Sequence, residues 1–298
     1  MNAPRFDATL AVPAQCALGE GATWCSRSGR FYWTDIEGAC LYRFDPSTGE
    51  RTSWSMPERL ATFALCADPQ YLLLGLATCL AFFDSTTHEI RSIVEVEPGL
   101  PTRLNDGRCD RQGRFVFGTK YEGTGGDVVG GFYRLDHDLS LTRLPLPTPA
   151  ISNSIGFSPD GTTMYFCDSP SREILACDYG ADGTVGGVRV FARLTDADGV
   201  PDGSTVDAEG GLWNAQWGGS RLVRYGADGV ETERVSVPVS QPSCVALGGP
   251  ELGTLYVTTA RVELDAAALE AQPEAGGIFA APSARRGLPE PVFQGRWR

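Results

Sequence analysis

The sequence has little material for the commonest catalytic centres. It contains only two histidines, His88 and His137, and each lies in a turn-like stretch beside an aspartate. A His-rich zinc site or a Ser-His-Asp triad is therefore hard to assemble. The sequence also lacks G-x-S-x-G, G-x-x-x-x-G-K and a strand-preceded G-x-G-x-x-G. These absences argue against a nucleophile-elbow hydrolase and against the usual nucleotide-binding folds.

Basic residues, long apolar runs and paired cysteine motifs are also scarce. The chain has 25 Lys and Arg against 37 Asp and Glu, a net charge of −12, which argues against nucleic acid or an anionic membrane as a partner. No apolar run approaches the roughly 18 residues of a spanning helix, and no signal pattern opens the chain. Nine cysteines without C-x-x-C spacing indicate reduced, buried thiols. We expect a soluble, cytoplasmic protein that is a monomer or a weak homo-oligomer.

A repeat of roughly 40–50 residues organises the chain, as is typical of β-propellers. Each unit has a polar residue entering a strand, a Gly-centred turn into a second strand, and a third strand that usually ends in Asp. The 36 glycines and 20 prolines are scattered, which suits short strands joined by tight turns. The polar residues that open the six units are Glu20, Thr62, Asn105, Asn153, Asp202 and Ser243.

The repeat predicts an all-β fold, a six-bladed β-propeller with four-stranded antiparallel blades, over a single domain spanning residues 1–298. Residues 6–12 and 291–293 are candidates for the strands that close the ring. Residues 262–271 are rich in Ala, Leu and Glu and are expected to form a short helix, inserted in the last blade.

In a propeller the innermost strands line a central channel, so the six opening residues should meet near one mouth. Glu20 and Asp202 would bring carboxylates, and Asn105 and Asn153 would bring amide oxygens. Buried carboxylates repel one another unless a cation pairs with them. Such a donor set suits Ca²⁺, Mg²⁺ or Mn²⁺, with Zn²⁺ or Fe²⁺ possible if waters complete the shell. The alternative is that these are ordinary satisfied polar residues in turns.

Other polar residues could bind a ligand above this site. Arg103 is two residues before Asn105 and should share its face of an extended strand. Asp106, Lys120 and Glu122 belong to the same unit, the latter two just after its second strand, and could hydrogen-bond a polyhydroxylated ligand. A solvated loop pair is the alternative interpretation of Lys120 and Glu122.

Four motifs in order resemble the sugar-lactonase family of gluconolactonase and regucalcin. They are Leu18-Gly-Glu-Gly21, Arg103-Leu-Asn-Asp-Gly107, Asn153-Ser-Ile-Gly-Phe-Ser-Pro-Asp-Gly161 and Pro201-Asp-Gly203. The resemblance implies a six-bladed propeller whose single catalytic metal ion is bound by Glu20, Asn153 and Asp202. It also implies substrate contacts at Arg103 and Asn105. The sequence departs from the family at Ser154, where Gly is usual, and at Lys120, where Met is frequent.

The expected activity is divalent-metal-dependent hydrolysis of an aldono-1,4- or 1,5-lactone, such as glucono-, xylono- or arabinonolactone, to the aldonic acid in carbohydrate catabolism. Asp202 would bind the metal ion and act as the general base. Two alternatives are a phosphotriesterase-like hydrolase on the same fold and a non-catalytic metal-binding propeller.

Overall fold

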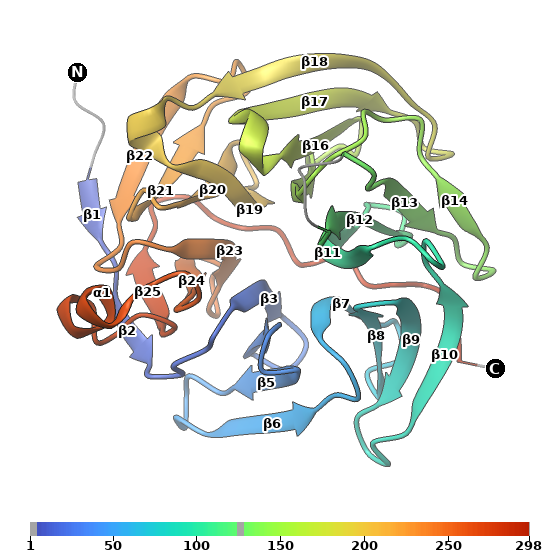
Figure 1. Ribbon diagram of the computed structural model, residues 1–298, viewed down its shortest axis with the longest axis horizontal. Helices are drawn as coiled ribbons and strands as arrows, with labels where there is room; N and C mark the ends of the chain where they lie inside the picture. The colour runs from blue at the N-terminus through green and yellow to red at the C-terminus, as the bar shows by residue number, and fades with distance from the viewer. Residues whose placement is uncertain (1–4, 124–127, 298) are drawn as a thin grey trace.

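Six antiparallel sheets surround a central channel like the blades of a propeller (Figure 1). The computed structural model describes residues 5–123 and 128–297. Each of the six predicted repeat units begins in the innermost strand of a blade. The predicted all-β, six-bladed propeller with four-stranded blades is therefore confirmed.

We number the blades 1 to 6 in chain order and give their strands from the channel outward. Blade 1 contains β3 (Gly19–Cys25), β4 (Arg30–Asp35), β5 (Cys40–Phe44) and β6 (Arg51–Ser55). Blade 2 contains β7 (Leu60–Leu65), β8 (Tyr71–Leu76), β9 (Cys79–Asp84) and β10 (Ile90–Glu95). Blade 3 contains β11 (Thr102–Cys109), β12 (Phe115–Tyr121), β13 (Phe132–Leu135) and β14 (Leu141–Arg143). Blade 4 contains β15 (Ser152–Phe157), β16 (Thr163–Asp168), β17 (Glu173–Tyr179) and β18 (Val185–Arg193). Blade 5 contains β19 (Val200–Val206), β20 (Leu212–Trp217), β21 (Arg221–Tyr225) and β22 (Glu231–Ser236). Blade 6 contains β23 (Pro242–Gly248), β24 (Thr254–Thr259) and β25 (Ile278–Pro282).

The N-terminal segment closes the ring. β2 (Thr9–Val12) pairs antiparallel with β25 and is the outermost strand of blade 6. β1 (Arg5–Asp7) instead pairs in parallel with β22, as a fifth strand on blade 5. The strand predicted over residues 6–12 is therefore interrupted at Ala8 and shared between two blades. Blade 6 thus contains strands from both ends of the chain, which holds the ring shut.

The second predicted closing segment does not join blade 6. Phe293 makes a single bridge with Cys66 of blade 2. Pro291 and Glu290 line the interior of the channel together with inner-strand residues of several blades. Prolines at 289 and 291 lack the N–H donors that a sheet ladder needs, so this stretch crosses the end of the channel instead of extending a blade.

The helical segments are short. α1 (Ala266–Ala271) lies within the predicted helical stretch 262–271 and confirms it, and its N-cap Asp265 accepts a hydrogen bond from the Ala268 N–H at 2.8 Å. Two 3₁₀ turns span Ser169–Ser171 and Asp196–Asp198. Within the described ranges no helix is both long and apolar enough to cross a membrane.

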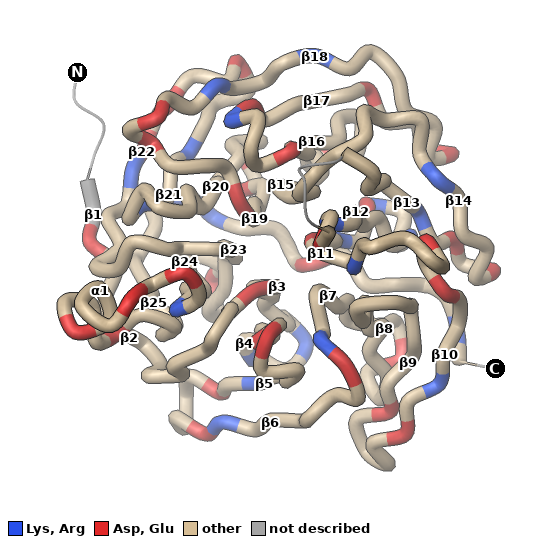
Figure 2. Tube along the Cα trace, in the orientation of Figure 1, with Lys and Arg blue, Asp and Glu red and all other residues tan. Residues whose placement is uncertain are grey.

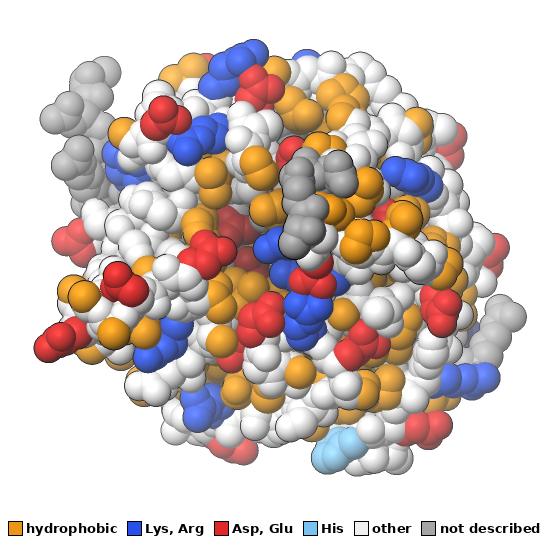
Figure 3. Space-filling view, viewed as in Figure 1, with side chains coloured by type: hydrophobic (Ala, Val, Ile, Leu, Met, Phe, Trp, Pro, Cys, Tyr) orange, Lys and Arg blue, Asp and Glu red, His pale blue; other side chains and the backbone are white. Residues whose placement is uncertain are grey.

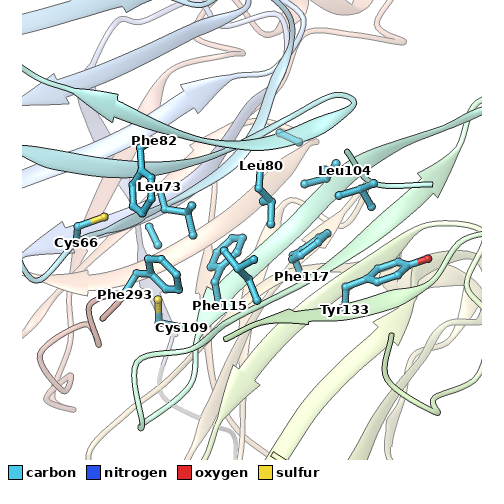
Figure 4. Packing of buried hydrophobic residues seen from close by; sticks show 14 of the residues in the cluster. Cys66, Leu73, Leu80, Phe82, Leu104, Cys109, Phe115, Phe117, Tyr133 and Phe293 are labelled. Carbon is cyan, nitrogen blue, oxygen red and sulfur yellow. The ribbon is translucent and has the colours of Figure 1, made fainter. Parts of the chain in front are cut away.

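Apolar side chains fill the spaces between neighbouring blades. Figure 4 shows one such cluster, in which Leu80 and Phe82 of blade 2 lie near Phe115 and Phe117 of blade 3. The rings of Phe115 and Phe117 stack with their centroids 5.6 Å apart. Phe293 from the C-terminal segment is completely buried in the same cluster. The segment that crosses the channel is therefore part of the core.

Replacing Phe293 by alanine tests this role of the C-terminal segment. Deleting a fully buried phenyl ring leaves a cavity, so the Phe293→Ala protein should lose about 3–5 kcal/mol of unfolding free energy, measured by urea denaturation. The control Val230→Ala changes a side chain that is 59% exposed and should stay within about 0.5 kcal/mol of wild type. Equal losses in the two variants would contradict a core role for the segment.

Candidate metal and substrate site

The innermost strands are irregular where the site residues lie. In all six of them the pairing register shifts, and in the four blades with candidate oxygen donors the shift lies between Glu20 and Thr23, Leu104 and Gly107, Asn153 and Gly156, and Pro201 and Ser204. A β-bulge bends its strand and redirects the side chains beside it. Figure 2 shows acidic segments of β3, β11 and β19 around the centre of the ring. The bulges thus bring polar side chains of separate blades to one mouth of the channel.

Two of the candidate metal ligands share a backbone feature. Glu20 and Asn153 are each followed by a residue in the left-handed region, Gly21 with φ 64° and Ser154 with φ 61°. Glycine adopts this conformation readily, whereas serine is strained in it. The Ser154 hydroxyl lies 2.6 Å from that of Ser204 in blade 5. This buried hydrogen bond ties blades 4 and 5 together and offsets part of the strain.

Two carboxylates at the mouth have few partners among the described residues, and Glu20 accepts a hydrogen bond from the Gly21 N–H at 3.3 Å. Asp202 is 6% exposed, and its Oδ1 has no hydrogen-bond partner in the part of the chain that the structure describes. Burial raises the pKa of Asp202 well above its ordinary value, the charge of Asp106 raises it further, and Lys120 opposes the shift. Burial likewise raises the pKa of Glu20, with Asp202 and Asp106 adding to the shift. The three negative charges therefore lie close enough to repel one another.

Asp106 was predicted from the sequence only as a possible hydrogen-bond partner of a ligand, and the structure places it in this acidic cluster. Its Oδ2 accepts a hydrogen bond from the Ile155 N–H of blade 4 at 2.8 Å, and its Oδ1 accepts one from the Gly107 N–H at 2.8 Å. In a regular strand, adjacent residues such as Asn105 and Asp106 point to opposite faces. The bulge in β11 removes this alternation, so Asp106 braces the neighbouring blade at the mouth.

A chain of hydrogen bonds fixes the two candidate amides. Arg103 Nη1 donates to Asn105 Oδ1 at 2.7 Å, and Asn105 Nδ2 donates to Asn153 Oδ1 at 3.0 Å. Asn153 Nδ2 then donates to the Ser169 hydroxyl at 2.9 Å, which itself donates to the Pro201 carbonyl at 2.7 Å. Because the Ser169 hydroxyl donates its hydrogen to the Pro201 carbonyl, the hydroxyl oxygen of Ser169 must accept the bond from the Asn153 amide nitrogen. The Asn153 oxygen is thereby directed to the side of Asn105.

The donor set fits a hard divalent cation. Glu20 and Asp202 offer carboxylate oxygens that form no ion pair with a described residue, and Asn153 offers an amide oxygen held in a fixed orientation. Within residues 5–123 and 128–297 no group of three or more His, Cys, Asp or Glu is arranged to hold a metal ion. A cation at this mouth would therefore depend on the Asn153 amide as well as on carboxylates. The unpartnered Oδ1 of Asp202 is the observation that most directly favours such a cation.

The remaining two opening residues play a different part. The Thr62 hydroxyl donates to the Gly107 carbonyl at 3.2 Å, and the Ser243 hydroxyl donates to the Gly19 carbonyl. Both bonds connect neighbouring innermost strands. Blades 2 and 6 thus tie the ring together at the mouth, and the candidate oxygen donors come from blades 1, 3, 4 and 5.

Arg103 lies within the wall of the mouth and is 2% exposed. Its Nη1 donates to the Leu104 carbonyl at 2.8 Å as well as to Asn105, and its Nε donates to Glu122 Oε1 at 3.2 Å. Over the described residues its Nη2 makes no hydrogen bond. This nitrogen is therefore the donor that Arg103 has left for a ligand.

Lys120 is the sole lysine of the sequence and lies opposite Arg103 in the β11–β12 ladder. Its ammonium group makes no hydrogen bond or ion pair with any described residue. Burial lowers the pKa of Lys120, as does the charge of Arg103, whereas Asp202 acts in the opposite direction. Among the described residues Lys120 is thus a cation without a direct partner, and it is near enough to Asp202 for their charges to interact. In Figure 3 basic side chains lie on one side of a central hollow that has acidic side chains at its depth.

Glu122 lies at the rim rather than inside the channel. Its Oε1 and Oε2 accept hydrogen bonds from Arg59 at 2.7 and 2.6 Å, and Oε1 also accepts from Arg103. The hydrogen bonds from Arg59 lower the pKa of Glu122. The structure therefore places Glu122 between two arginines, of which Arg59 was not singled out by any sequence motif.

The opposite end of the channel is obstructed. Arg108 of β11 donates to the Ser204 carbonyl at 2.9 Å and to Glu290 of the C-terminal segment at 2.7 Å. Glu290 and Pro291 line a small cavity beneath Asp106. A ligand would therefore enter and leave by the mouth that carries the carboxylates.

The fold and the site define a six-bladed propeller with carboxylate and amide oxygens gathered at one channel mouth. The family model described as SMP-30/Gluconolactonase/LRE-like region matches residues 18–261, and the chain belongs to this family. The expected family resemblance is thereby confirmed.

Individual relatives match over almost their whole length. The chain is 60% identical over 293 residues to the L-arabinolactonase of Azospirillum brasilense, covering 98% of this chain and 97% of the relative. It is 35% identical over 288 residues to the pentonolactonase XacC of Haloferax volcanii, covering 95% and 96%. The crystal structure of regucalcin, a calcium-binding protein from Agrobacterium tumefaciens, superposes with a TM-score of 0.92 at 32% identity, covering 98% and 99%.

The repulsion within the acidic cluster gives a test of the cation site. With a chelator present, Asp202→Asn should unfold at a higher temperature than wild type, because it removes one uncompensated buried charge. Mn²⁺ at about 100 times its dissociation constant should stabilise wild type by about 2.7 kcal/mol, and this gain should be largely lost in the variant. Thermal unfolding followed by circular dichroism measures both effects.

The matched control is Asp178→Asn, whose carboxylate is 74% exposed and pairs with Arg189 on blade 4. It should keep the full response to Mn²⁺. A wild-type protein that Mn²⁺, Ca²⁺ and Zn²⁺ all fail to stabilise would contradict a cation site at the mouth.

Proposed function

We propose that the protein hydrolyses the lactone of a pentonic acid, with an arabinonolactone as the first substrate to test, to the open-chain aldonic acid. The observation that carries the proposal is the buried Oδ1 of Asp202, which has no hydrogen-bond partner among the described residues and lies in a cluster of oxygen donors near Lys120. Relatives named L-arabinolactonase and pentonolactonase support the choice of substrate.

We propose one divalent metal ion as the cofactor, held by Glu20, Asn153 and Asp202. When bound, it would polarise the lactone carbonyl and stabilise the charge that develops on its oxygen. Two carboxylates and an amide favour an oxygen-seeking ion such as Ca²⁺, Mn²⁺ or Mg²⁺ over a thiolate- or imidazole-seeking one.

Asp202 is the proposed general base. Its Oδ1 makes no hydrogen bond with the described chain, so the carboxylate has lone pairs left both for the metal ion and for a proton of the attacking water. The water oxygen adds to the carbonyl carbon, the bond from that carbon to the ring oxygen breaks, and the proton passes to the departing ring oxygen. The Asn214 amide, which donates to the Asp202 carbonyl at 2.8 Å, holds the backbone of the base in place.

Four residues of blade 3 are proposed to bind the substrate. Arg103 would donate to the ligand through Nη2, and Asn105, fixed between Arg103 and Asn153, would define the wall beside it. Lys120 would add an ammonium donor that no described residue engages in a hydrogen bond or ion pair. Glu122 would contribute from the rim by way of Arg103.

The setting of the reaction follows from charge and thiol chemistry. All nine cysteines are unpaired, which supports a reducing compartment such as the cytoplasm. A net charge of −12 supports a small-molecule substrate rather than nucleic acid or an anionic membrane. Because the proposed ligands all come from one ring, we propose that residues 1–298 act as one domain and that a single chain suffices.

A substrate panel tests this function. Acid release near pH 7, corrected for spontaneous opening, is measured with arabinono-, xylono- and gluconolactone and with a phosphotriester. We expect kcat/KM to be highest for a pentonolactone. Asp202→Asn should lower kcat at saturating metal by about 10²-fold or more, whereas Asp178→Asn should leave it unchanged. Preference for the phosphotriester would favour the alternative hydrolase, and metal binding without turnover would favour a binding protein.

The role of Lys120 can be tested separately. Lys120→Met removes a charged donor, which is worth about 1.5–3 kcal/mol in a hydrogen bond, so KM for the preferred lactone should rise about 10-fold or more with a smaller change in kcat. Because the chain has one lysine, reductive ¹³C-methylation should give a single lysine NMR signal, which should shift on titration with the aldonic acid. An unchanged KM and an unmoved signal would rule out contact with the ligand.

A further inference from the structure

Blade 2 contributes an arginine to the mouth instead of an oxygen donor. Arg59 lies directly before β7, the innermost strand of blade 2. Its two terminal nitrogens donate to the two carboxylate oxygens of Glu122 in blade 3, at 2.7 and 2.6 Å. A second carboxylate, Glu37 of blade 1, lies 3.5 Å from Arg59 Nη1. Bidentate arginine–carboxylate pairs fix direction as well as distance, so Arg59 sets the orientation of Glu122.

Glu122 in turn holds Arg103. Within the described residues Glu122 is the one carboxylate in ion-pair contact with Arg103, whose guanidinium is almost fully buried. A buried guanidinium needs such a partner, because the interior does not solvate its charge. Glu122 alone would be a partly exposed rim side chain with little to restrict it. The pair with Arg59 therefore makes Glu122 a fixed acceptor for Arg103 Nε.

The contacts on Arg103 leave one direction open. Nε donates to Glu122 and Nη1 donates to the Leu104 carbonyl and to Asn105, so among the described residues Nη2 is the nitrogen left for the ligand. The plane of the guanidinium is thus set by one bond on the rim side and two on the channel side. Without the hydrogen bond from Arg103 Nε to Glu122, the guanidinium plane could rotate about Nη1, and the direction in which Nη2 points would no longer be fixed.

From this geometry we infer that Arg59 is a positioning residue for the substrate-binding face, acting on Arg103 through Glu122. This inference rests on the proposed function of the site. Both terminal nitrogens of Arg59 donate to Glu122, and the inference assigns Arg59 this contact with Glu122 and none with the substrate. Glu122 accordingly accepts hydrogen bonds from both arginines and links them. Through Arg59, blade 2 influences the proposed active site although it supplies none of the proposed metal ligands.

Kinetics of three variants test the inference. Arg59→Met should raise KM for the preferred lactone about 10-fold, with kcat within about twofold of wild type, because the metal ligands and Asp202 are untouched. Arg59→Lys keeps the charge but not the bidentate geometry and should give an intermediate KM. Glu122→Gln combined with Arg59→Met should add little to the effect of either change alone.

The matched control is Arg193→Met, which breaks an arginine–glutamate pair with Glu173 on the outer strand of blade 4. It should leave KM unchanged, and its melting temperature should match that of Arg59→Met. A rise in KM that only accompanies a loss of stability, or no rise in KM at all, would overturn the positioning role.

A substrate-free readout separates this inference from the proposed function. In ¹⁵N-arginine-labelled protein, the Nε–H signal of Arg103, assigned with Arg103→Lys, should exchange slowly with water in wild type and faster in Arg59→Met. Faster exchange in a protein that opens no lactone would support the positioning role while the proposed function failed. Equal exchange in Arg59→Met and Arg193→Met would overturn the positioning role even if lactone hydrolysis were established.

Discussion

Repulsion among buried carboxylates is the constraint on which this site depends. Glu20, Asp106 and Asp202 come from three different blades, and the circular arrangement of the innermost strands brings them to one mouth. Asp106 has backbone N–H groups as partners, but Asp202 Oδ1 has none in the described chain. Such an arrangement is unfavourable in itself. It becomes favourable with a positive charge at the centre, which is why the same feature supports both a cation site and a hydrolytic function.

The rest of the ring holds this unfavourable cluster in place. Bulges aim the side chains, the strained Ser154 is tied to Ser204 across a blade boundary, and Thr62 links β7 to β11. Fully buried apolar clusters between the blades supply the stability that the mouth lacks. The C-terminal segment obstructs the far end through Glu290 and Phe293. The channel thus serves as a one-ended pocket with a rigid wall.

Much of this could be predicted from sequence because a propeller repeats. The polar residue at the start of each unit marked all six innermost strands, and their shared phase predicted that Glu20, Asn105, Asn153 and Asp202 lie near one mouth. The family resemblance, not the phase, selected Glu20, Asn153 and Asp202 as metal ligands. Features that break periodicity could not be found in this way. The bulge that turns Asp106 toward the mouth cancels the alternation on which strand predictions depend. Arg59 precedes its strand and belongs to no motif, so its pairing with Glu122 is visible only once blades 2 and 3 are placed side by side.

The central claim, that a divalent cation binds between Glu20, Asn153 and Asp202, is tested most directly by anomalous diffraction from a crystal soaked in Mn²⁺. The account predicts one strong anomalous peak at the channel mouth, about 2.0–2.6 Å from oxygens of these three side chains. Absence of a peak there, or a peak only elsewhere on the protein, would contradict it.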